Sequence, residues 1–148
     1  MAHYTENRKA RFNYEILEKY EAGIELLGVE VKSVRGGRMS LEGAFVIIRG
    51  GEAFLINSNI PPYQPNNVPK DYDPLRNKKL LLTKKEIATL AGSEKNKSLT
   101  IVPISVYNKG RKIKVGIALV KGKKKQDKRE SIKKRETDRE IRRELKER

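Results

Sequence analysis

The stretch LTIVPISVYNKGRKIKVGIAL, from Leu99 to Leu119, decides the fold. Residues 99–107 are rich in β-branched residues, which favour strands, and Asn-Lys-Gly at 108–110 is typical of a turn. Hydrophobic residues then alternate with other types at Ile113, Val115, Ile117 and Leu119. Because side chains of a strand alternate between its two faces, this pattern predicts a second strand that returns beside the first.

Further strands are predicted before this pair. Residues 14–21 alternate with both faces partly apolar and continue past Gly23 to residue 27. The short apolar runs 45–48 and 53–56 flank Arg-Gly-Gly-Glu at 49–52, which predicts a hairpin.

Short helices and one loop complete the pattern. Residues 29–35 followed by Gly36-Gly37 favour a short helix with a glycine end, although a strand also fits. Thr83 with Glu86 three residues later is a capping box, which predicts a helix that ends at Gly92. Five prolines mark residues 57–73 and their surroundings as a loop. We therefore expect a mainly β fold, an OB-fold-like antiparallel barrel with short helices, over residues 1–120.

Residues 121–148 form a separate basic C-terminal tail. The tail has a net charge of +7 and only three aliphatic residues, Ile132, Ile141 and Leu145. It cannot bury enough apolar surface to offset the entropy of ordering, so we expect it to be disordered when free. It has no Gly or Pro after residue 126, so it can become helical on a surface that neutralises its charge; a solvated helix packed on the body is the alternative.

The charge of the whole chain indicates a polyanionic partner. The 148 residues carry 34 Lys and Arg against 19 Asp and Glu, a net charge of +15. There is no apolar segment long enough for a signal or a membrane span, so we expect a cytoplasmic protein. A membrane-surface role is weaker than nucleic-acid binding because the tail lacks a clean apolar face.

The residue inventory gives no basis for an enzyme, a cofactor or a metal site. There is no Cys, and the single His is His3. Glu15, Glu18 and Glu21 are close in sequence, but in a regular strand Glu18 points away from the other two. There is also no phosphate-binding glycine motif. We expect a binding protein without cofactors.

Two basic segments in the body favour RNA. The first holds Arg8, Lys9 and Arg11 and leads into Phe12 and Tyr14, so that cations for phosphate lie beside rings for stacking. The second, with Arg76 and Lys78, runs into Leu80-Leu81-Leu82, where at least one leucine is expected to be core. The basic tail adds affinity for phosphate that does not depend on sequence.

Six segments together resemble one family. They are Asn7–Arg11, Glu21–Gly23, Gly28–Ser33 with Arg35, Gly51–Phe54, Lys79–Leu82, and Gly122–Lys124 followed by Asp127–Arg129. In this order and spacing they resemble the SsrA-binding protein family, also called small protein B. The resemblance implies a monomer that binds the tRNA-like domain of transfer-messenger RNA and enters stalled ribosomes for trans-translation. It also implies that the tail reaches the small-subunit decoding region and the messenger channel, where it becomes helical.

The resemblance also assigns residues. It places Glu21, Leu81 and Thr83 on the RNA-facing edge of the barrel and adds Lys32 and Arg35 to the RNA-binding set. In the tail it implies ribosome contacts by Lys123, Lys124, Gln126, Asp127, Lys128 and Arg129.

This chain departs from the family at three positions. It has Gln126 and Phe12 where the family often has His, and Thr83 where it often has Asn. Without the resemblance, a ribosomal or RNA-chaperone OB protein that binds structured rRNA is the alternative.

Overall fold

The chain forms a small antiparallel β-barrel with three helices in the residues described here. The computed structural model describes residues 3–62 and 70–122. The strands are β1 (His3–Glu6), β2 (Tyr14–Ile24), β3 (Phe45–Arg49), β4 (Glu52–Ile56), β5 (Lys78–Leu81), β6 (Leu99–Lys109) and β7 (Lys112–Gly122), and the helices are α1 (Arg8–Asn13), α2 (Gly28–Arg35) and α3 (Lys84–Glu94). None of these helices is long and apolar enough to cross a membrane.

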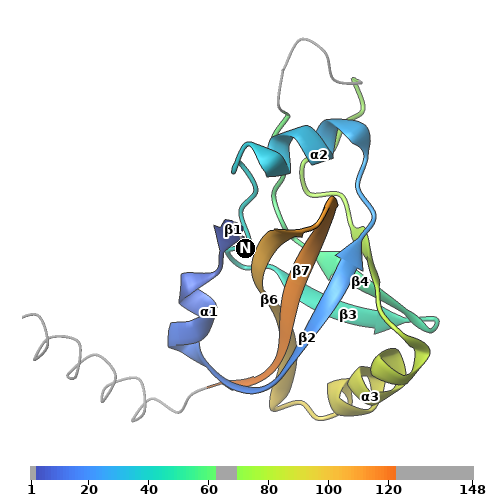
Figure 1. Ribbon diagram of the computed structural model, residues 1–148. Helices are drawn as coiled ribbons and strands as arrows, with labels where there is room; N and C mark the ends of the chain where they lie inside the picture. Colours follow the sequence, from blue (N-terminus) through green and yellow to red (C-terminus); the bar gives the residue numbers. More distant parts are fainter. Residues whose placement is uncertain (1–2, 63–69, 123–148) are drawn as a thin grey trace, which may run out of the picture.

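The sheet closes on itself. Its strand order is β1-β6-β3-β4-β5-β2-β7, and β7 also pairs with β6, so six strands form a closed ring with β1 added on β6. Figure 1 shows α2 at one end of this ring and α3 at the other, with α1 on its flank. The prediction of a mainly β, OB-like barrel with short helices is confirmed. The division at residue 120 stays a prediction, because residues 123–148 lie outside the described part.

The strand pair β6–β7 is the centre of the barrel, as the alternation predicted. Val115, Ile117 and Leu119 face the main core, which is also lined by residues of β3, β4 and β5. Ala118 and Val120 face the other way and pack with Ala10 of α1. Strand β7 is therefore buried on both faces from Ile117 to Val120.

Glycines fix the predicted hairpin and the end of α2. Gly50 and Gly51 join β3 to β4 with φ of 59° and 76°, a backbone region that other residues adopt only with strain. Gly36 is the C-cap of α2, and Gly37 follows with φ of 75°. Both predictions are confirmed, and residues 29–35 are helix rather than strand.

Two element ends differ from the predictions. Strand β2 ends at Ile24, because Leu27 already serves as the N-cap of α2. Helix α3 has the predicted capping box but passes through Gly92 to Glu94. Glu94 accepts a hydrogen bond from the Ile48 backbone N–H, and this bond stabilises the additional half-turn of α3.

A β-bulge in β2 reverses the prediction for its glutamates. The register with β7 shifts between Ile16 and Glu18. Glu15 and Glu18 consequently share a face, whereas Glu21 points to the opposite one, contrary to the regular-strand expectation. Within residues 3–62 and 70–122, no group of three His, Asp or Glu side chains lies close enough to hold a metal ion.

Candidate nucleic-acid interface

A row of residues from four strands lies on the outer face of the barrel. The row includes residues that the sequence predicts to bind RNA and residues that it does not. Gly23 lies opposite Leu81 of β5 on one side and opposite Lys114 of β7 on the other. Lys114 in turn lies opposite Tyr107 of β6. Directly opposite residues of neighbouring strands share a face, so this row crosses β5, β2, β7 and β6.

Gly23 allows Leu81 to lie across β2. Leu81 is 49% exposed, whereas Leu80 is buried in the core. A Cβ at Gly23 would lie 3.2 Å from the Leu81 Cβ, so a larger residue there would push the leucine aside. Leu81 is therefore a surface group with an apolar face available to a partner.

A basic hollow lies at the α2 end of this row. It has a volume of about 350 Å³ and an apolar lining that includes Val31 of α2 and Leu81. The cations around it are Arg35, Arg111, Lys112 and Lys114. The Arg35 guanidinium donates a hydrogen bond to the Arg111 carbonyl at 3.2 Å, which holds α2 beside the β6–β7 turn. Cations around an apolar floor suit the phosphates and an exposed base of RNA.

Glu21 lies beside the hollow and is held by two donors. The Tyr107 hydroxyl donates to its Oε2 at 2.5 Å, and the Lys109 ammonium donates to its Oε1 at 2.9 Å. These two bonds, with Tyr107 the larger cause, lower the pKa of Glu21, so the carboxylate is ionised at neutral pH. Burial and the bond to Glu21 raise the pKa of Tyr107 to about 12, so its hydroxyl stays a donor.

The chain has the sequence of a known family over nearly its whole length. A family model described as SmpB protein matches residues 4–147. The chain belongs to the SmpB family.

Curated relatives and a solved structure agree with this assignment. The SsrA-binding protein of Gloeothece citriformis is 51% identical over 142 residues, covering 96% of this chain and 92% of the relative. That of Enterococcus faecalis is 52% identical over 141 residues, covering 95% and 91%. A solved structure described as "tmRNA-SmpB: a journey to the center of the bacterial ribosome" is similar with a TM-score of 0.69 and 43% identity, covering 86% of this chain and 93% of that one. The predicted resemblance is confirmed.

The predicted residues on α1 and α2 of this SmpB chain are exposed. Arg8, Lys9 and Arg11 lie on α1, although Lys9 forms an ion pair with Glu42. Lys32 and Arg35 are exposed on α2, and Arg35 reaches the basic hollow.

Thr83 is exposed at the start of α3, where its hydroxyl oxygen accepts a hydrogen bond from the Glu86 backbone N–H. The structure therefore gives Thr83 a capping role. An RNA contact by Thr83 remains a prediction.

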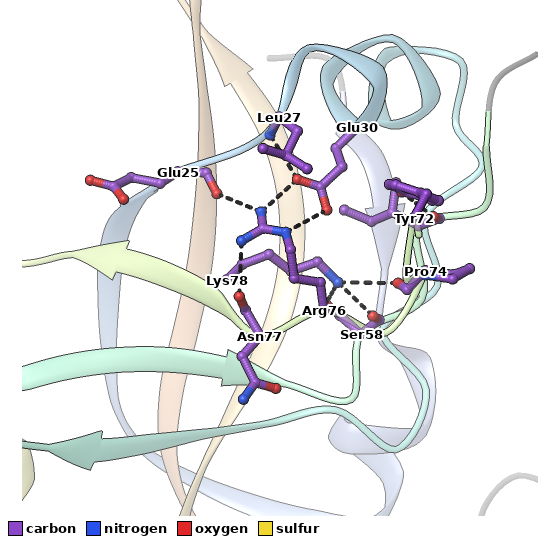
Figure 2. Close-up of polar contacts among 10 residues, drawn as sticks. Glu25, Leu27, Glu30, Ser58, Tyr72, Pro74, Arg76, Asn77 and Lys78 are labelled. Carbon is purple, nitrogen blue, oxygen red and sulfur yellow. Dashed lines mark hydrogen bonds and ion pairs between the residues drawn. The ribbon is translucent and has the colours of Figure 1, made fainter. Parts of the chain in front are cut away.

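Arg76 is bound within this SmpB chain instead of standing free for RNA. Its guanidinium donates to both carboxylate oxygens of Glu30, at 2.6 and 3.3 Å, and to the carbonyls of Glu25 and Asn77 (Figure 2). Glu30 is fully buried and also accepts from the Leu27 backbone N–H. Since four hydrogen bonds occupy a group with five N–H donors, the geometry supports a structural role for Arg76.

Lys78 is a correction to the RNA-binding set. Its side chain is fully buried, and its ammonium donates to the Ser58 carbonyl, the Ser58 hydroxyl and the Pro74 carbonyl (Figure 2). An enclosed ammonium cannot reach a phosphate, so the expectation of an RNA contact is wrong for this conformation. Burial lowers the pKa of Lys78 to about 8.

Sequence reasoning missed the β6–β7 contribution to the surface. The alternation in these strands predicts their core residues, and by itself it does not mark Tyr107, Lys109, Lys112 and Lys114 as a binding surface. The same alternation that puts Ile113 and Val115 on one face puts Lys112 and Lys114 on the other. The sequence therefore contains a signal for this surface, because the residues that alternate with core residues of β7 include these two lysines.

The six tail residues of the predicted ribosome contact lie outside the described residues; they are Lys123, Lys124, Gln126, Asp127, Lys128 and Arg129.

Proposed function

We propose that this chain binds the tRNA-like domain of transfer-messenger RNA with the outer face of β5, β2, β7 and β6 and delivers that RNA to stalled ribosomes for trans-translation. The observation that carries the proposal is the gathering of Leu81, Glu21 and the cations of the basic hollow on one face of an SmpB-family barrel. Gly23 and Gly116 have no side chains, so RNA can approach the backbone of this face closely.

The chemistry of this face suits recognition of a folded RNA. Arg35, Arg111 and Lys112 supply positive charge for phosphates, and Leu81 supplies an apolar contact for an exposed base. The role is binding, and the proposal includes no reaction catalysed by the chain. Delivery to ribosomes places this action in the cytoplasm.

The tail completes the proposed function. Residues 121–148 carry a net charge of +7, and the first two of them are the end of β7. We propose that Lys123, Lys124 and residues 126–129 contact the small subunit near its decoding region, while the body holds the transfer-messenger RNA.

Fluorescence anisotropy, which measures binding of the full chain to the isolated tRNA-like domain, tests the proposal. Leu81→Asp is expected to weaken binding at least tenfold, since it puts a negative charge against RNA. Leu75→Asp is the matched control, because Leu75 is 47% exposed and belongs to none of the four strands of this face. Equal effects of the two variants, or tighter binding of the wild type to rRNA fragments than to this domain, would overturn the proposal.

A further inference from the structure

A pocket beside Glu21 is distinct from the basic hollow. It has a volume of about 400 Å³, and its lining includes Arg11, Lys19, Glu21, Tyr107 and Gly116. Gly116 lies directly opposite Glu21 on one side and Ser105 on the other. We refer to this space as the Glu21 pocket.

The Glu21 pocket owes its depth to Gly116. A Cβ at this position would lie 3.3 Å from the Ser105 hydroxyl and 3.5 Å from the Tyr107 ring. Any side chain there would fill the floor between these two groups. The tyrosine ring therefore bounds the pocket, and the space between it and Glu21 is left open.

Glu21 presents a fixed anionic acceptor at this opening. Tyr107 and Lys109 each occupy one of its two oxygens, and an ionised carboxylate has about four acceptor positions. The side chain is 35% exposed, so acceptor capacity remains on the side that faces solvent. Because two donors of β6 restrain the two carboxylate oxygens, the direction of the carboxylate does not depend on the ligand.

We infer that the Glu21 pocket takes one unpaired guanine base of the RNA, whose N1–H and N2–H donate to the two oxygens of Glu21. This inference rests on the proposed function and names the ligand of one part of its surface. Guanine has two adjacent donors on its pairing edge, which match a carboxylate. Adenine and cytosine offer one amino group next to a ring acceptor, and uracil offers one imino group between two carbonyls, so each of them turns an acceptor toward Glu21.

The surroundings of the pocket suit the rest of the nucleotide. Arg11 and Lys19 are both exposed at the lining, where they can neutralise the phosphates on either side of an extruded base. Tyr107 and Lys109 act through Glu21, so they are positioning residues for this contact.

The test uses the full chain and the tRNA-like domain with each unpaired guanosine replaced, one at a time, by inosine. Inosine lacks only the N2 amino group. At one position, inosine is expected to weaken binding about tenfold, as is usual for loss of one hydrogen bond to a charged group. Glu21→Gln is expected to weaken binding of the unmodified RNA similarly and to show no further loss with that inosine RNA. Loss at no position, or fully additive losses, would overturn the inference.

Two further variants separate positioning from general damage. Tyr107→Phe is expected to reduce the discrimination between guanosine and inosine, whereas Tyr72→Phe, which removes a hydroxyl bonded to the Ile60 carbonyl, is expected to leave it unchanged. Equal discrimination by both variants and the wild type would remove Tyr107 from the proposal. If the wild type failed to bind the unmodified domain, the proposed function itself would fail; binding without any inosine effect would refute only the guanine pocket.

Discussion

Removing either partner of the buried Glu30–Arg76 pair is expected to have unequal effects on stability. Glu30 has no exposed side-chain surface, whereas the side chain of Arg76 is 35% exposed. Arg76→Ala therefore leaves a buried carboxylate without its main partner, while Glu30→Gln leaves a cation that water can reach.

The structure sets the size of each effect. Loss of one partner of a buried ion pair costs about 3–5 kcal/mol. We expect Arg76→Ala to cost about 3 kcal/mol, at the low end of that range, because the Leu27 N–H and the nearby Lys78 ammonium remain to compensate Glu30. Glu30→Gln keeps an oxygen acceptor in the same place, so we expect a loss of about 1 kcal/mol.

Urea unfolding followed by circular dichroism measures both free energies. Arg49→Ala is the control, because it removes an ion pair with Glu94 in which the arginine is 64% exposed, and its cost is expected to stay below about 1 kcal/mol. A loss for Glu30→Gln that equals or exceeds the loss for Arg76→Ala would refute the reasoning.

Three other predictions follow from the same structure. Deleting residues 123–148 should leave the thermal transition and the binding of the tRNA-like domain unchanged while abolishing rescue of stalled ribosomes in a translation assay; a lost transition would show that the body needs the tail. In an alkaline absorbance titration, Glu21→Gln should lower the pKa of Tyr107 from about 12, and an unchanged curve would contradict the bond between them. The pKa of Lys78 is about 8 when folded and 10.5 when unfolded, so the unfolded chain holds more protons between these values. Stability relative to Lys78→Met should therefore rise over this range, by up to about 3 kcal/mol in urea unfolding, and a falling difference would be inconsistent with the buried ammonium.

The periodic parts of the fold could be predicted from the sequence. Strands β6 and β7 follow from alternation, and the Gly50-Gly51 hairpin and the Thr83 cap follow from local backbone chemistry. Strand β1 and helix α1 could not be found in the same way. They are short, and α1 is fixed by Asn7, whose side chain accepts from Ala10 and donates to carbonyls of Leu41 and Pro103, far along the chain.

The candidate site was predictable only in part for a related reason. Charge identifies which residues are basic, but not which of them already have partners. Arg76 and Lys78 are in one basic run with Lys79, yet the first binds Glu30 and the second is enclosed with Ser58. Those partners come from α2 and from the segment after β4, which no local pattern connects to residue 76.

The β3–β6 contact gives the barrel a mechanical weak point. The two strands share a single residue pair, Val46 with Ile101, whereas β6 and β7 pair along their whole length. Next to that contact, the Glu94 carboxylate of α3 accepts hydrogen bonds from the Ile48 backbone N–H and from the Arg49 guanidinium. A helix side chain therefore binds β3 where strand pairing with β6 is sparse. Local opening of a protein begins where backbone pairing is sparse. Because backbone pairing is sparse at the β3–β6 contact, we expect local opening of the barrel to begin there, near α3 and away from the basic hollow at the α2 end.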